Sequence, residues 1–130
     1  MKTLFTIFFS FCMILGLQSQ TYMELTDNME IPSNSYIKIL GGDYIFSDYE
    51  WDGVIHIHDK ENIILDGDSV TVEGGNFMGY MIDIQNSSNI MIRNFDLVNN
   101  YKYAVRVMNS ENIAIQYNNF SYNKKDTLGW

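Results

Sequence analysis

Three side chains that can bind ions or transfer protons stand at one position of a repeated pattern. His56, Asp83 and Arg106 are each the middle residue of an Ile-x-Ile or Val-x-Val triplet. An imidazole, a carboxylate and a guanidinium that lie side by side can bind a uronate or supply a general acid and a general base. The alternative is a solvated surface column in which Asp83 pairs with its cationic neighbours and contributes little.

The loop before Arg106 adds further candidates and is expected to open onto this column. β-Elimination on a uronic acid needs a base and a cation that neutralises the carboxylate. Lys102 is the candidate base if the nearby charge of Arg106 lowers its pKa, and Arg106 is the candidate for binding the carboxylate. The candidate substrate-binding residues are His56, Asp83, Tyr101 and Tyr103. An ordinary solvated loop is the alternative.

A metal site has weaker support. Asp66 and Asp68 form a pair of carboxylates, as in an inverting hydrolase or a calcium site. Asp66 belongs to an Asp-Gly turn, so a structural role is the favoured interpretation. His58 has no second histidine at ligand spacing, which argues against zinc. We therefore predict no cofactor; calcium is compatible with the carboxylates but has no recognisable motif.

These residues belong to a pattern that occurs three times, over residues 54–65, 81–92 and 104–115, without a gap in the alignment. In every copy one position holds an asparagine: Asn62, Asn89 and Asn112. The asparagines are 27 and 23 residues apart. Repeats of this length indicate stacked units that bury a core only against their neighbours.

Each copy contains two short runs with a period of two, which predict half-buried strands. A third apolar position follows eight residues after each asparagine, at Val70, Leu97 and Phe120. Three strands per unit predict a parallel β-solenoid whose coils lie about 4.8 Å apart. The expected core columns are Ile57 on Ile84 on Val107 and Ile63 on Ile90 on Ile113. The three asparagines are expected to form a hydrogen-bonded ladder.

A leucine-rich repeat is the competing interpretation. Residues 113–120 fit its pattern, but the other two copies lack the second asparagine, and each copy has an additional strand-like run upstream. The β-solenoid is therefore favoured.

The chain resembles the right-handed parallel β-helix superfamily that includes pectate lyases and polygalacturonases. The resemblance covers residues 35–123 and is carried by the coil motif, by an entry strand at Ile39–Phe46 and by the turn at Leu65–Asp68. It implies an all-β, right-handed parallel β-helix of about three coils after an N-terminal entry strand. It also implies a substrate groove along the outer face that carries His56, Asp83 and Arg106.

This resemblance implies a function in carbohydrate chemistry without fixing the reaction. One expectation is a lyase or hydrolase that acts on a plant or algal polysaccharide. The other is a non-catalytic glycan-binding or adhesion protein. The Asp-Asp pair and the Gly-His-Gly segment of polygalacturonases are not matched, nor is the calcium-binding aspartate set of pectate lyases, and this favours the second expectation.

The chain divides into four expected segments. Residues 1–19 form a secretory signal peptide, with Lys2 before an apolar run that is too short to span a membrane. Residues 20–52 are a lead-in with the entry strand, residues 53–123 form the coils, and residues 124–130 begin a further coil or loop. The last coil is an ordinary interior coil, so the solenoid is predicted to continue beyond residue 130.

Composition limits the location and the partners. Cys12 is the only cysteine and lies in the signal peptide, whose removal also takes Lys2 and moves the formal charge from −8 to −9. The expected location is secreted, periplasmic or at the cell surface. An acidic chain is unsuited to nucleic acid and anionic membranes, so the expected partner is a polysaccharide or oligosaccharide. The oligomeric state stays open.

One column of the second strand is apolar on its outer side. Its members are Ile64, Met91 and Ala114. Because an apolar column is unusual on a solvated face, the lead-in or a partner is expected to cover it.

Overall fold

The computed structural model describes residues 19–123, so the predicted signal peptide, apart from Ser19, and the C-terminal segment 124–130 lie outside the described residues. The described chain is all-β. Its strands are β1 (Gln20–Met23), β2 (Met29–Glu30), β3 (Ser35–Ile39), β4 (Gly42–Ile45), β5 (Ile55–His58), β6 (Glu61–Asp66), β7 (Val70–Glu73), β8 (Tyr80–Gln85), β9 (Ser88–Arg93), β10 (Leu97–Asn99), β11 (Tyr103–Met108) and β12 (Glu111–Gln116). No helix among these residues is long and apolar enough to cross a membrane.

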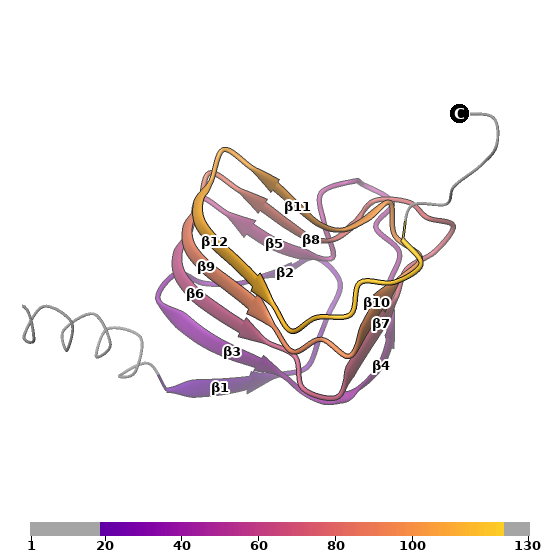
Figure 1. Ribbon diagram of the computed structural model, residues 1–130, viewed down its shortest axis with the longest axis horizontal. Helices are drawn as coiled ribbons and strands as arrows, with labels where there is room; N and C mark the ends of the chain where they lie inside the picture. Colours follow the sequence, from indigo (N-terminus) through magenta and orange to yellow (C-terminus); the bar gives the residue numbers. More distant parts are fainter. Residues whose placement is uncertain (1–18, 124–130) are drawn as a thin grey trace, which may run out of the picture.

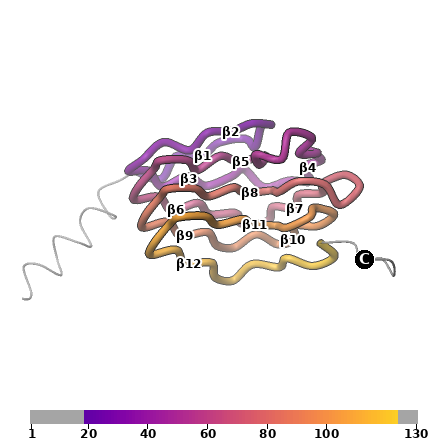
Figure 2. The backbone as a smooth tube through the Cα atoms, turned by 90° about the horizontal axis from the view of Figure 1, so that it is seen from above, coloured from indigo at the N-terminus to yellow at the C-terminus, as the bar shows by residue number. Residues whose placement is uncertain are grey.

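The strands form three parallel sheets that share one core (Figure 1). Sheet A has the order β1-β3-β6-β9-β12, sheet B the order β11-β8-β5-β2, and sheet C the order β10-β7-β4. The chain visits sheets B, A and C in turn, and each round lies on the one before (Figure 2). This is a parallel β-solenoid of about three turns, as predicted. Three strands per coil exclude the leucine-rich repeat.

The solenoid begins earlier than the sequence suggested. Strands β2, β3 and β4 pair with β5, β6 and β7, so residues 29–45 of the expected lead-in already form a coil. Strand β1 pairs in parallel with β3 and forms the edge of sheet A. The lead-in therefore does not cover the apolar column of Ile64, Met91 and Ala114, whose side chains are half-buried.

The predicted core columns are present. Ile57 pairs with Ile84 and Ile84 with Val107; Ile63 pairs with Ile90 and Ile90 with Ile113. The third column differs by one residue: Leu97 pairs with Thr71, and Val98 takes the buried position beside Val72. The reason is an extra residue in the turn before β7, where Asp68 and Ser69 both have positive φ angles.

The two ends of the core differ. Leu25, Met29 and Ile31 are buried at the N-terminal end, with at most 5% of each residue exposed. At the other end Val107 is 41% exposed and Ile115 is 43% exposed, although their partners in the preceding coil, Ile84 and Ile92, are fully buried. Among residues 19–123, the last coil therefore presents apolar side chains and strand edges that pair with no further strand.

The asparagine ladder is confirmed and has a fourth member. The Nδ2 of Asn62 donates to Asn34, that of Asn89 to Asn62, and that of Asn112 to Asn89, at 2.9–3.1 Å. All four residues have φ angles of 56–58°, in the left-handed region that asparagine tolerates better than other non-glycine residues. Asparagine at this position thus adopts the backbone conformation that the turn requires and supplies the side-chain amide that forms the ladder.

Replacing Asn89 with alanine is expected to cost about 2 kcal/mol, because it removes two exposed hydrogen bonds and places alanine in a left-handed conformation. Asn62→Ala should cost the same, since Asn34 gives Asn62 two ladder neighbours as well. Asn112→Ala, which loses one bond, should cost less. Asn89→Gly also tolerates the left-handed backbone conformation, so its free energy of unfolding should be about 1 kcal/mol higher than that of Asn89→Ala. Urea unfolding measures both values. Equal stability of Asn89→Ala and the parent protein would contradict this.

Candidate functional site

The predicted column on the outer face of sheet B is present and has a fourth member. Asp83 pairs with His56 on one side and with Arg106 on the other, and His56 pairs with Glu30. We call these four residues the outer column. A parallel column holds His58, Gln85 and Met108, two positions further along the same strands. Because alternate residues of a strand share a face, the two columns lie together on the outside of the solenoid.

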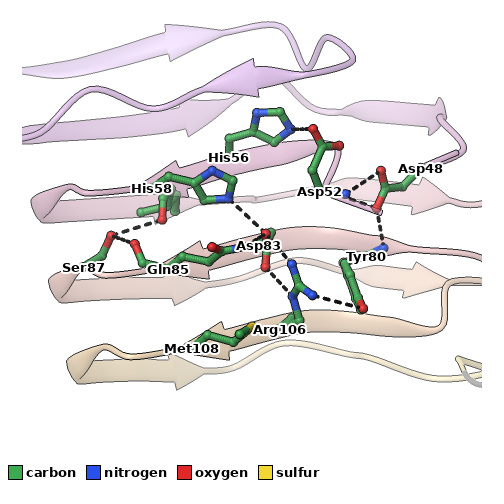
Figure 3. Close-up of polar contacts among 12 residues, drawn as sticks. Asp48, Asp52, His56, His58, Tyr80, Asp83, Gln85, Ser87, Arg106 and Met108 are labelled. Carbon is green, nitrogen blue, oxygen red and sulfur yellow. Dashed lines mark hydrogen bonds and ion pairs between the residues drawn. The ribbon is translucent and has the colours of Figure 1, made fainter. Parts of the chain in front are cut away.

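Asp83 is the centre of a closed polar cluster (Figure 3). Its carboxylate accepts hydrogen bonds from Arg106 Nε at 2.7 Å and Nη2 at 2.9 Å, and from Gln85 Nε2 at 2.7 Å. His58 Nε2 lies 3.0 Å from the same carboxylate. These neighbours cover Asp83 so completely that none of its surface is exposed. The Asp83 carboxylate is thus buried and contacts three side chains of the protein itself.

The electrostatics of this cluster argue against acid–base work by Asp83. Burial raises the pKa of Asp83, but the hydrogen bonds from Arg106, Gln85 and His58 outweigh it and hold the pKa below its usual value. A carboxylate held ionised and saturated with donors is a poor proton acceptor. Arg106 is equally engaged, because its fork binds Asp83 and its Nη1 lies 3.3 Å from the Tyr80 hydroxyl. The predicted use of that fork for a substrate carboxylate would require it to leave Asp83.

The predicted loop residues 101–103 contribute one exposed ring, from the first residue of β11. Tyr103 is 45% exposed, and Lys102 Nζ lies 5.9 Å from the centre of its ring. The expectation that Tyr101 overhangs the column is wrong, because its side chain is fully buried and its hydroxyl donates to the Phe46 carbonyl at 2.7 Å. Gly74 makes room for this ring, since a Cβ there would lie 2.7 Å from Tyr101 Cε1. Burial also raises the pKa of Tyr101 well above its usual value.

An aromatic cluster of Trp51, Tyr80 and Tyr103 adjoins Arg106. The rings of Tyr80 and Tyr103 are parallel, with centroids 6.1 Å apart, and Trp51 meets Tyr80 edge-on at 5.8 Å. Arg106 lies over the Tyr80 ring at 4.2 Å, a cation–π distance. Tyr80 is nearly buried, while Trp51 is 41% exposed. The cluster therefore offers two exposed rings on either side of one covered ring.

The buried carboxylate of Asp48 positions Trp51. It accepts hydrogen bonds from the backbone N–H groups of Asp52, Gly53 and Tyr80 at 2.8–3.3 Å. Gly79, with a φ of 63°, allows the backbone to pass close to this carboxylate. These bonds fix the turn that carries Trp51 against the first residue of β8.

Asp52 and His56 form a looser pair on the same face (Figure 3). Asp52 Oδ2 lies 3.5 Å from His56 Nε2, and the His56 ring is stacked on the His58 ring at 5.2 Å. Among the described residues, the buried side-chain polar atoms without a hydrogen-bond partner are Asp52 Oδ1, His56 Nε2 and Asn99 Oδ1. Two of these three atoms thus belong to one pair beside Trp51.

The pair of Asp66 and Asp68 is divided between different cations. Asp66 accepts hydrogen bonds from Arg93, Asn94 and Tyr36, whereas Asp68 lies 3.1 Å from Lys38 Nζ. Within residues 19–123, no three His, Cys, Asp or Glu side chains are grouped so as to hold a metal ion. Asp66 with Arg93 on sheet A repeats the arrangement of Asp83 with Arg106 on sheet B, which supports a structural role for both pairs.

These two carboxylates predict how stability depends on pH. For Asp66, as for Asp83, burial raises the pKa but hydrogen bonds outweigh it, so both folded-state values lie below the ordinary 3.8. A depressed carboxyl pKa contributes stability that is present above the unfolded value and is lost as the pH falls through the folded value. We expect a thermal midpoint that is steady above about pH 5 and falls below about pH 4, and a shallower fall in Asp83→Asn. A midpoint that rises on acidification would contradict this.

Sequence reasoning missed Trp51, Tyr80, Glu30, Gln85 and the pairing role of His58. Tyr80 had a usable signal, since it precedes Tyr103 by 23 residues, the same step that separates Asn89 from Asn112. Trp51 had none, because it lies in a turn outside the repeats.

The chain matches no known family model, and neither the curated proteins nor the solved structures give a significant match.

Proposed function

We propose that this protein is a non-catalytic, glycan-binding β-solenoid that acts outside the cytosol, and that the aromatic cluster and the outer column form its binding face. One observation carries the proposal: Asp83 and Arg106 of the column neutralise each other, and the rings of Trp51 and Tyr103 are exposed beside them. An exposed aromatic ring beside polar side chains suits a sugar, which has apolar C–H faces and hydroxyl edges.

The resemblance to the pectate lyase-like superfamily supports the same class of ligand. It also suggests a right-handed solenoid, and the apolar segment 1–19 independently suggests export. The outer face that the resemblance assigns to the substrate is the face that carries the aromatic cluster. Fold alone does not fix an activity, so the argument depends on the side chains.

Binding is favoured over catalysis because two of the candidate site residues are engaged within the structure. Arg106 is held by Asp83 and Tyr80, and Asp83 has no exposed surface. A lyase that used Arg106 for charge stabilisation would have to break a bidentate ion pair in every turnover.

One observation favours a lyase or hydrolase as the second candidate. Asp52 and His56 lie 3.5 Å apart, and an imidazole next to a carboxylate is a common acid–base arrangement. In this interpretation Lys102 and Arg106 retain the roles that the sequence suggested. The two candidates differ in one measurable property, because only the enzyme releases product.

The experiment is titration of the full chain with soluble xylan, mannan, glucan and uronate oligosaccharides by calorimetry, followed by a search for products. We expect saturable binding of at least one class, with neither new reducing ends nor the absorbance of unsaturated uronates. Turnover that is lost in His56→Ala would establish the enzyme instead. Failure to bind any oligosaccharide would overturn the proposal.

A further inference from the structure

We infer that His56 and His58 together bind a divalent transition metal ion, Cu²⁺ in particular, through their Nδ1 atoms. The inference goes beyond the proposed function and requires no glycan. Both residues belong to β5, and because alternate residues of a strand share a face, both lie on the outside of sheet B. Their rings are parallel to within 5°, with centroids 5.2 Å apart. Neighbouring imidazoles are ligands that suit Cu²⁺, Ni²⁺ and Zn²⁺.

Each imidazole has a carboxylate at its Nε2 atom (Figure 3). Asp83 Oδ2 lies 3.0 Å from His58 Nε2, and Asp52 Oδ2 lies 3.5 Å from His56 Nε2. A carboxylate only accepts hydrogen bonds, so it favours the tautomer with the proton on Nε2 and leaves the lone pair on Nδ1. Carboxylates fix metal-binding histidines in the same way and raise the basicity of the nitrogen that binds the ion. Both rings are thus prepared to bind an ion through Nδ1.

The two Nδ1 atoms are open to solvent. Among residues 19–123, neither has a hydrogen-bond partner, and neither is among the buried polar atoms that lack one, although His56 Nε2 is. The side chain of His58 is 30% exposed and that of His56 is 14% exposed. An ion therefore reaches both nitrogens from outside without replacing a hydrogen bond within the protein.

The rings have to move little to share one ion. Metal ions bind imidazole nitrogen at about 2.0–2.1 Å, so the two Nδ1 atoms have to lie about 3 Å apart. Rotation about χ2 supplies this approach, because that torsion of histidine has broad energy minima. The surrounding charge favours a cation, since Glu30 pairs with His56 and the Asp52 and Asp83 carboxylates face the two rings.

The donor set defines the ion and the kind of site. Within the described part of the chain, no third His, Cys, Asp or Glu side chain completes a metal-binding group with these two. Water is left to fill the other positions, which suits the tetragonal N,O geometry of Cu²⁺ and does not suit a closed structural zinc site. Cu²⁺ also binds most tightly to nitrogen and oxygen donors in the divalent series. Ca²⁺ and Mg²⁺ prefer oxygen ligands and are not expected to compete.

The test is calorimetric titration of the full chain with CuCl₂, followed by electron paramagnetic resonance of the complex. The chain is produced without a histidine tag, because His56 and His58 are then its only imidazoles. We expect saturation at one ion per chain and a spectrum with two coordinated imidazole nitrogens. Zn²⁺ should bind at least about 10-fold more weakly, in line with the order of the divalent series.

His56→Gln and His58→Gln each remove one ligand and keep a polar side chain. Loss of an outer hydrogen-bond partner alone lowers metal affinity about 10- to 100-fold, so each variant should bind Cu²⁺ at least about 10-fold more weakly. Each should also show one coordinated imidazole nitrogen. Asp43→Asn is the matched control: it removes an exposed carboxylate from β4 of sheet C and should bind Cu²⁺ like the parent.

The spectrum of the parent chain identifies the ligands without any variant, and circular dichroism confirms that the variants are folded. No saturable binding of Cu²⁺ by the parent, or a parent spectrum with fewer than two imidazole nitrogens, overturns the inference. Unchanged affinity in both histidine variants overturns it as well. Glycan binding is measured without metal, so its outcome is separate.

Discussion

Replacing Asp83 with alanine is expected to lower the free energy of unfolding by about 3 kcal/mol, because removal of one partner from a buried ion pair leaves the other charge uncompensated. The Asp83 side chain is fully buried and is bonded to Arg106, Gln85 and His58. Arg106 and His58 are each about 30% exposed, so water recovers part of their hydrogen bonding and the value lies at the lower end of the usual range. Urea unfolding followed by circular dichroism measures the loss.

A double-mutant cycle separates the ion pair from simple loss of packing. Asp83→Ala combined with Arg106→Ala should cost less than the sum of the two single changes, because no charge is then left without its partner. Asp43→Ala is the control for removal of an exposed carboxylate and should stay within about 0.5 kcal/mol of the parent. A loss below about 1 kcal/mol in Asp83→Ala would show that the cluster contributes little to stability.

Removing both exposed rings of the aromatic cluster, in Trp51→Ala/Tyr103→Ala, is expected to weaken glycan binding about 100-fold. Each ring should contribute about 10-fold through stacking on a sugar face and burial of apolar surface, which corresponds to about 1.4 kcal/mol. The rings lie on either side of Tyr80, so both can contact one oligosaccharide chain. Calorimetric titration of the best neutral oligosaccharide measures the effect.

Two controls accompany this variant. Trp51→Phe/Tyr103→Phe keeps an aromatic face at both positions and should bind within about 5-fold of the parent. Tyr22→Ala/Tyr117→Ala removes two exposed tyrosines, one on β1 of sheet A and one directly after β12 of sheet A, and should bind like the parent. Equal losses in the two double alanine variants would show that the effect is not specific to the cluster.

The sequence predicted the fold because a solenoid repeats its determinants. Each coil repeats the same alternation of Ile or Val with polar residues. One correct alignment of residues 54–65, 81–92 and 104–115 therefore gives the register of sheets A and B. The same alignment places His56, Asp83 and Arg106 in one column. Asparagine at a left-handed turn position is also a local requirement that a single residue can reveal.

The misplaced features lie where the repeat is interrupted. The extra residue in the turn before β7 changes the register of β7 and β10 by one, so that Val98 and not Leu97 is buried in the third column. Counting eight residues from each asparagine cannot detect this change. The inward position of Tyr101 depends on space beside Gly74, which comes from another coil. Burial of Asp83 likewise follows from neighbours on two adjacent strands. Such packing is a property of assembled coils and is absent from any one repeat.

The candidate site divides in the same way. Alternation within strands identified the outer column, but the residues that decide its chemistry come from turns and strand starts. Trp51 is placed by hydrogen bonds from backbone groups to Asp48, and Tyr80 by its pairing with Tyr103. The column therefore appeared as a free His–Asp–Arg set in the sequence and as a neutralised cluster beside aromatic rings in the structure.

The emission of Trp51 during glycan binding tests the central claim most directly. The chain has two tryptophans, and Trp130→Phe leaves Trp51 as the sole emitter. If sugars bind on the aromatic cluster, the neutral oligosaccharide that binds best should shift the emission to shorter wavelength and protect it from acrylamide, with a midpoint equal to the calorimetric Kd. An oligosaccharide that binds by calorimetry while the emission and quenching of Trp51 stay unchanged would contradict the account.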